Sequence, residues 1–205
     1  MDNAVALVQA YLRVNGYFTV SEFPIIELRQ REGYRTATDL DILAFRFPGA
    51  GKLVASRRGT RVGGEARFTP DPKLGVPPTQ PDMIIGEVKE GRAVLNAATT
   101  DPAVLEIVLA RFGCCSRADA PRFAAALLRA GTTILPAGHR VRLMAFGSIA
   151  DPAGGGAYER LPLGHVVRFL QHYLRKHWAV LRHEDSKDPA LGFLTILEKC
   201  ATSEP

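Results

Sequence analysis

The sequence predicts an α/β fold in which a mixed central sheet is flanked by helices. Two runs, 38–47 and 83–89, are rich in apolar residues and bounded by turn residues, which is typical of strands. Apolar residues at helical spacing precede the first run at the N-terminus and recur through the second half of the chain. A chain of 205 residues is long enough to bury one sizeable core, so we expect a single domain over residues 1–205.

The composition of the chain indicates which partners and which cellular compartment to expect. The net charge of +5 favours polyanionic partners such as nucleic acid. No apolar run approaches the ~20 residues that a membrane-spanning helix needs, and the N-terminus lacks a basic-then-apolar signal pattern. Cys114, Cys115 and Cys200 have no zinc-site spacing and fit a reducing compartment. We therefore expect a cytoplasmic protein that has no membrane partner.

The N-terminal part of the chain predicts a helix followed by an extended segment. The helix should begin at Asp2 or Asn3, both of which are good caps, and end at about Val14. Residues 17–28 are then expected to be extended. Pro24 lacks an N–H group, so it makes this segment an edge strand or bends it.

The strand predicted at 38–47 carries an acid inside an apolar run. Because side chains alternate along a strand, Asp41 should lie on the face opposite Leu40 and Ile42, among apolar neighbours. An ionised carboxylate in such surroundings is costly unless it is paired or bound to a metal. Asp41 therefore needs a partner.

Residues 49–81 form a predicted insertion that is dense in glycine and proline and poor in apolar residues. Residues 53–55 and 66–69 could pair as a basic hairpin, and a loop without function is the alternative. Arginines in this insertion can form charge-assisted hydrogen bonds with backbone phosphates. The residues expected to contact nucleic acid are Arg57, Arg58, Arg61 and Arg67.

The rest of the chain predicts strands and helices that would complete a layered domain. Its last part, about 164–201, is expected to be a C-terminal helical part. The expected elements are a buried strand at 83–89, helices at about 101–112 and 119–130, a strand at 141–147, and helices at about 164–182 and 189–199.

The second strand ends in charged residues, which a buried strand does not do without a reason. Glu87 and Lys89 should point to one face, about 7 Å apart along the chain. If the two apolar strands are antiparallel neighbours, Asp41 lies across from Glu87 at a side-chain spacing of ~5 Å. Two carboxylates that close repel each other unless a cation lies between them. Asp41, Glu87 and the carbonyl of Val88 therefore suit Mg²⁺ (or Mn²⁺), with Lys89 orienting or deprotonating a water. The alternative is an ion pair at the surface.

The two predicted strands that carry Asp41 and Glu87 resemble a pair of strands found in a known protein family. Thr-Asp-Leu-Asp-Ile-Leu-Ala at 38–44 and Ile-Ile-Gly-Glu-Val-Lys at 84–89 look like the metal-binding strands of the PD-(D/E)XK nuclease superfamily, which has the restriction-endonuclease-like fold. Residues 8–17 are similar to the helix-then-strand opening of its Holliday-junction-resolvase-like members. The resemblance covers about residues 5–100. It implies an αβββαβ core and metal-dependent hydrolysis of phosphodiester bonds in DNA or RNA.

The resemblance also implies roles for individual residues. Asp41 and Glu87 match the carboxylates of the family, and Lys89 matches its lysine. Pro81-Asp82 ahead of Glu87 also spells the family motif, but five residues along one strand place Asp82 and Glu87 on opposite faces. We therefore predict that Asp41, and not Asp82, is the ligand.

Two departures from the family pattern leave a second function open. The gap between the two carboxylates is longer than the family usually shows, and the acid that often assists from the first helix has no clear counterpart. That helix offers Asp2 and Gln9, while Glu22 or Glu27 could substitute from the next segment. The alternative to a nuclease is a catalytically inactive, nuclease-like module for nucleic-acid binding or assembly. In either case the exposed face of the C-terminal helices could form a homodimer.

Overall fold

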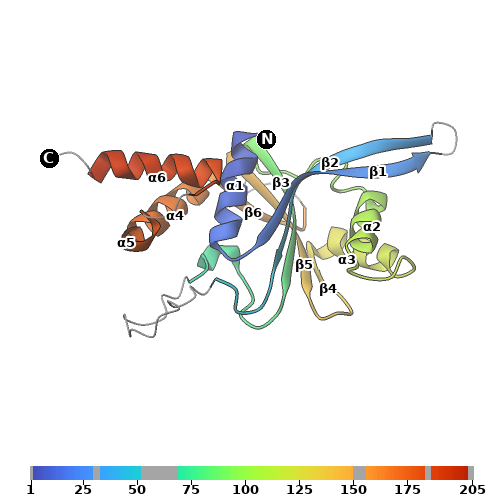
Figure 1. The fold of residues 1–205 in the computed structure, drawn as a ribbon. Helices are drawn as coiled ribbons and strands as arrows, with labels where there is room; N and C mark the ends of the chain where they lie inside the picture. The colour runs from blue at the N-terminus through green and yellow to red at the C-terminus, as the bar shows by residue number, and fades with distance from the viewer. Residues whose placement is uncertain (1, 30–32, 52–68, 150–155, 183–185, 203–205) are drawn as a thin grey trace.

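A mixed six-stranded sheet forms the centre of the molecule (Figure 1). The structure is a computed structural model, and it describes residues 2–29, 33–51, 69–149, 156–182 and 186–202. The strands are β1 (Phe18–Arg29), β2 (Gly33–Arg46), β3 (Asp82–Arg92), β4 (Thr132–Ile134), β5 (Arg140–Ile149) and β6 (Glu159–Pro162). They lie in the order β1-β2-β3-β5-β4, and β6 pairs with the second half of β5. β2 is antiparallel to β1 and β3, whereas β5 is parallel to β3 and β6.

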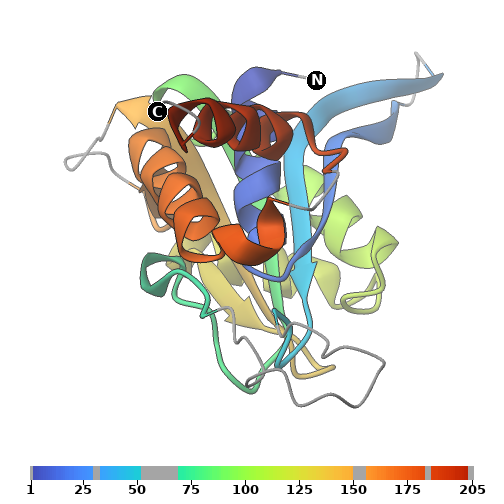
Figure 2. The same ribbon diagram turned by 60° about the vertical axis from the view of Figure 1, so that its left-hand side comes forward.

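Helices cover both faces of the sheet (Figures 1 and 2). They are α1 (Asn3–Val14), α2 (Pro102–Arg111), α3 (Ala120–Ala130), α4 (Leu163–Lys176), α5 (Trp178–Leu181) and α6 (Pro189–Thr202). One core lies between the sheet and α1, α4 and α6, and Ile84 of β3 points into it. The next residue, Ile85, points into a second core under α2 and α3. The predicted α/β class, with a mixed sheet flanked by helices, is confirmed.

The N-terminal elements form where the sequence predicts them. A carboxylate oxygen of Asp2 accepts the N–H of Ala4 at 2.7 Å and caps α1, which ends at Val14. β1 is the edge strand of the sheet, so Pro24 occupies a position where its missing N–H is tolerated.

β2 and β3 are antiparallel neighbours, which is the condition that the predicted site requires, but they pair over a short stretch. The ladder runs from Arg46↔Asp82 to Ile42↔Gly86 and ends there. The pairing of β1 with β2 continues to Arg29↔Gly33. Within the described part of the chain, the distal part of this hairpin therefore has no third strand beside it, and it projects beyond the sheet (Figure 1).

The alternation of side chains between the two faces is interrupted at the point where the hairpin leaves the sheet. Leu40 and Leu43 both pack in the core under α2 and α3, although strict alternation would place them on opposite faces. In β1, the residue between the partners of Leu40 and Ile42 is Glu22, and it has a φ angle of 52°. The prediction that Leu40 shares a face with Ile42 is therefore wrong, because the alternation is interrupted between these two residues, opposite Glu22 with its positive φ angle.

Three further differences from the predicted elements have local causes. β2 begins at Gly33 rather than at residue 38, since the hairpin strand continues outside the sheet. The helix predicted at 164–182 is broken at His177, whose φ of −110° and ψ of 18° end α4 before α5 begins. β4 and β6 span 3 and 4 residues, which is too short for a periodic signal.

The predicted insertion is only partly described. The hairpin expected within it lies outside the described residues. Residues 69–81 pack against the body of the protein: Leu74 is fully buried, and the Tyr11 hydroxyl donates to the Asp71 carboxylate at 2.7 Å. Among the described residues, no helix has the length and apolar character needed to cross a membrane.

Candidate functional site

The irregularity in β2 turns the Asp41 carboxylate toward β3. Asp41 Oδ2 accepts the backbone N–H of Val88 at 2.8 Å. Asp41 lies one residue beyond Ile42↔Gly86, the last pair of the ladder between β2 and β3. The Asp41 side chain therefore takes over a hydrogen bond that the ladder between the two strands would otherwise supply.

This contact also fixes the direction of a backbone carbonyl. The N–H and C=O groups of one strand residue point to the same edge of that strand. Because the Val88 N–H points to Asp41, the Val88 carbonyl faces the same edge. Asp41 and the Val88 carbonyl, two of the three predicted metal ligands, thus lie where β2 separates from β3.

Glu87 is held by three side chains. It is 1% exposed, and its Oε1 accepts the Nδ2 of Asn96 at 2.8 Å. Its Oε2 accepts the hydroxyl of Thr99 at 2.8 Å. The ammonium of Lys89, whose side chain is 40% exposed, forms an ion pair with Oε1. The structure therefore brings Glu87 and Lys89 together on one face, next to the edge where Asp41 meets Val88.

Asn96 and Thr99 were not predicted as site residues. Both lie in the loop between β3 and α2, and Asn96 Oδ1 accepts the backbone N–H of Thr99 at 2.6 Å. The spacing of an Asn and a Thr three residues later is typical of a local side-chain-to-backbone turn, which occurs in many loops. The sequence carries no further signal that this turn contacts Glu87.

The charges of the site shift two pKa values. Burial raises the pKa of Asp41, and the negative charge of Glu87 adds to the rise, although the hydrogen bond from Val88 acts in the opposite direction. Burial alone would lower the pKa of Lys89, but the hydrogen bond and the charge of Glu87 outweigh it and raise that pKa. Lys89 is therefore an ammonium at neutral pH, which suits it to orient a water rather than to deprotonate one.

The donor groups fit a hard divalent cation. Asp41, Glu87 and the Val88 carbonyl offer only oxygen atoms, the ligands that Mg²⁺ prefers. Burial raises the pKa of Asp41, and the charge of Glu87 adds to the rise; a cation bound between the two carboxylates would offset their repulsion. Among the described residues, no three side chains of His, Cys, Asp or Glu form a group suited to a metal ion. A cation here would therefore need the backbone carbonyl and water to complete its shell.

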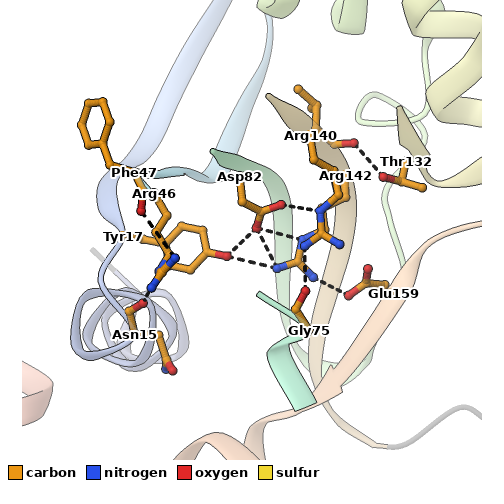
Figure 3. Close-up of polar contacts among 11 residues, drawn as sticks. Asn15, Tyr17, Arg46, Phe47, Gly75, Asp82, Thr132, Arg140, Arg142 and Glu159 are labelled. Carbon is orange, nitrogen blue, oxygen red and sulfur yellow. Dashed lines mark hydrogen bonds and ion pairs between the residues drawn. The ribbon is translucent and has the colours of Figure 1, made fainter. Parts of the chain in front are cut away.

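Asp82 has a different environment, in a buried cluster of charges (Figure 3). Asp82 is fully buried and accepts Arg140 Nε at 2.6 Å and an Arg142 guanidinium nitrogen at 2.9 Å. The hydroxyl of Tyr17 also donates to it, and Arg142 pairs in turn with Glu159. The cluster joins β3, β5 and β6 to the start of β1, so Asp82 contributes to the packing of the sheet.

The residues considered for the acid that assists the metal have different surroundings in the structure. The negative charge of Asp2, which caps α1, contributes to the raised pKa of Asp41. Glu27 instead pairs with Arg35 at 2.7 Å in the projecting part of the hairpin. Gln9 of α1 is buried.

The structure does not describe the basic residues that are predicted to contact nucleic acid. Arg57, Arg58, Arg61 and Arg67 lie outside the described residues. No family model, no curated protein and no solved structure matches the chain. The candidate site therefore rests on its own geometry.

Proposed function

We propose that this protein is a metal-dependent nuclease that hydrolyses phosphodiester bonds in DNA or RNA. The observation that carries the proposal is the contact of the Asp41 carboxylate with the backbone N–H of Val88, the residue between the paired side chains of Glu87 and Lys89. It gathers two carboxylates, a carbonyl and an ammonium where β2 leaves β3. Mg²⁺ (or Mn²⁺) is the proposed cofactor.

The order of the elements supports this proposal. α1, β1, β2, β3, α2 and β5 follow one another along the chain, and β3 pairs with β2 on one side and β5 on the other. This sequence of elements fits the αβββαβ core of the restriction-endonuclease-like fold. α3 and β4 would then be additions between α2 and the last core strand, and α4 to α6 would be a C-terminal extension.

Each residue of the site has a distinct role in the proposed reaction. Asp41, Glu87 and the Val88 carbonyl would hold the cation, which acts as a Lewis acid on the phosphate when it is bound. Lys89 donates a hydrogen bond to the attacking water and keeps it in line with the scissile bond. A lysine side chain is protonated at neutral pH, so it is able to donate.

The proposed substrate follows from charge. The net charge of +5 favours a polyanion, and the arginines between residues 57 and 67 are proposed to contact its phosphates. We infer that the substrate is a nucleic acid, DNA or RNA, and expect binding that weakens steeply as salt increases.

The test is cleavage by the purified full-length chain. Single-stranded, duplex and branched DNA, and RNA of the same sequences, are incubated with Mg²⁺ or Mn²⁺. Asp41→Asn and Lys89→Ala should each lower the rate by at least about 100-fold, the range for loss of a positioned catalytic group. Glu90→Gln removes a charge from an exposed neighbour of the site and should cut like the wild type. Cleavage that survives both site substitutions unchanged would refute the proposal.

A binding module without catalysis is the second candidate, and one observation favours it. Both oxygens of Glu87 already have partners in Asn96, Thr99 and Lys89, so the carboxylate is satisfied in the absence of a metal. Calorimetry separates the two functions. Salt-sensitive DNA binding by a protein that takes up neither Mn²⁺ nor Mg²⁺ would support the module.

A homodimer is also proposed, through the outer face of α6. Phe193, Ile196 and Leu197 are 61%, 58% and 47% exposed and form a stripe at helical spacing. A second copy would cover this stripe and bring a second centre to the other strand of a duplex. Light scattering should give the mass of a dimer for the wild type and of a monomer for Leu197→Glu. A wild type that stays monomeric at high concentration contradicts this part of the proposal.

A further inference from the structure

The carboxylate of Glu87 has two kinds of partner. Neutral donors bind each of its oxygens: Asn96 Nδ2 reaches Oε1 and the Thr99 hydroxyl reaches Oε2, both at 2.8 Å. A charged donor, Lys89, shares Oε1 with Asn96. A carboxylate offers about four lone-pair positions, so these three contacts leave about one open.

The neutral partners are themselves fixed by the loop. The backbone N–H of Thr99 donates to Asn96 Oδ1 at 2.6 Å, which leaves the amide nitrogen of Asn96 to face Glu87. The hydroxyl of Thr100 donates to the Asn96 carbonyl at 3.1 Å, and Thr99 is fully buried. Asp101 then caps α2 by accepting the N–H of Ala103 at 2.9 Å. The turn is thus anchored from the end of β3 to the first turn of α2.

Lys89 is the less constrained partner. Its side chain is 40% exposed, whereas those of Glu87 and Thr99 are 1% and 0% exposed. A long, half-exposed side chain loses rotamer freedom when it stays in one ion pair, and such pairs contribute little. Lys89 can therefore leave Oε1 without disturbing the hydrogen bonds from Asn96 and Thr99.

We propose that Asn96 and Thr99 are positioning residues that orient the Glu87 carboxylate for a divalent cation, and that Lys89 is the cationic partner which the metal displaces from it. This inference rests on the proposed function. In the absence of metal, Lys89 neutralises Glu87. When a cation binds, the ammonium is released toward the water that it orients, while the two neutral donors keep Glu87 in place.

The two kinds of partner should respond to substitution in opposite directions. Partners that orient a metal ligand typically contribute about 10- to 100-fold in metal affinity. Thr99→Val, which keeps the shape of the side chain and removes the hydroxyl, should therefore weaken Mn²⁺ binding by about that factor. Thr99→Ser keeps the hydroxyl and should restore it. Lys89→Met removes the competing charge and should strengthen Mn²⁺ binding by about 2- to 5-fold, the value of a half-exposed ion pair.

The experiment is calorimetric titration of the full chain with Mn²⁺, without nucleic acid. Thr36→Val is the matched control, because Thr36 is exposed in the projecting hairpin and its loss should not change the affinity. Thermal unfolding without metal shows that each variant is folded. Should Thr99→Val fail to fold, Asn96→Ala answers the same question at the other oxygen of Glu87.

The outcomes distinguish this inference from the proposed function. A wild type that neither binds Mn²⁺ nor cleaves nucleic acid overturns both. A wild type that binds Mn²⁺, with Thr99→Val and Asn96→Ala binding it equally well, overturns the positioning role alone. Weaker binding by Lys89→Met overturns the displacement, since it would make Lys89 a support of the metal rather than its competitor.

Discussion

Asp82→Asn is expected to destabilise the fold, because it removes the negative charge from the buried cluster in Figure 3. Asp82 and Arg142 are both fully buried, and their atoms are 2.9 Å apart. Removing one partner of such a pair costs about 3–5 kcal/mol, since the other charge stays buried. Glu159 still pairs with Arg142, so we expect the lower end, about 3 kcal/mol. For a chain of this length that lowers the melting temperature by about 10 °C.

Asp41→Asn should have the opposite effect: it should leave the fold stable and abolish cleavage. An asparagine oxygen can still accept the N–H of Val88, so the contact between the strands survives. The folded-state pKa of Asp41 is raised, mainly by burial. The stability linked to this group is therefore fully present below the unfolded-state pKa of about 4 and is lost as pH rises through the folded-state pKa. Asp41→Asn does not suffer this loss, so at pH 7 it should be as stable as the wild type or more stable, yet inactive.

The assay is urea and thermal unfolding of the two variants and the wild type at pH 4 and pH 7, with cleavage measured in parallel. Glu90→Gln serves as the control for the loss of one charge from β3. The reasoning fails if Asp82→Asn melts like the wild type. It also fails if Asp41→Asn loses several kcal/mol, because Asp41 would then be the structural acid.

Two further predictions concern cysteine reactivity and acid stability. Burial raises the pKa of Cys114 to about 11, whereas Cys200 is exposed, so iodoacetamide at pH 8 should label Cys200 in the native protein and Cys114 only on unfolding. Equal labelling rates in a peptide mass analysis would contradict this. Burial would raise the pKa of Asp71, but hydrogen bonds from Tyr11 and His165 outweigh it and lower that pKa. Its contribution to stability is therefore present above the unfolded-state pKa of about 4 and lost as pH falls through the folded-state pKa. Urea midpoints from pH 6 to pH 2 should fall less steeply for Tyr11→Phe, and identical slopes would argue against it.

Local patterns were sufficient for the main elements of this fold. The helix that Asp2 caps and the apolar strands β2 and β3 depend on periodicity and on turn residues, which neighbours in sequence supply. The same holds for α2, which begins behind Asp101. The short strands β4 and β6 were missed, because three or four residues carry no period and form only against β5.

The candidate site was predictable in its charged residues and not in their surroundings. Asp41, Glu87 and Lys89 stand out because charges interrupt apolar strands, and such interruptions are costly. Alternation misplaced Leu40, since the strand pair is irregular between Leu40 and Ile42, where Glu22 of the neighbouring strand has a φ angle of 52°. The role of a neighbouring strand in this irregularity cannot be read from the period of one strand alone.

The sequence by itself determined that two acids and a lysine interrupt two apolar strands of an α/β domain, because side-chain alternation and burial act along the chain. Only the tertiary structure decided what each charge contacts. Asp82 pairs with Arg142 in the core, Asp41 accepts the backbone N–H of Val88, and Asn96 donates a hydrogen bond to Glu87. These contacts join residues that approach each other only when the chain folds, and hydrogen bonds depend on distances of a few ångströms that residue order does not specify.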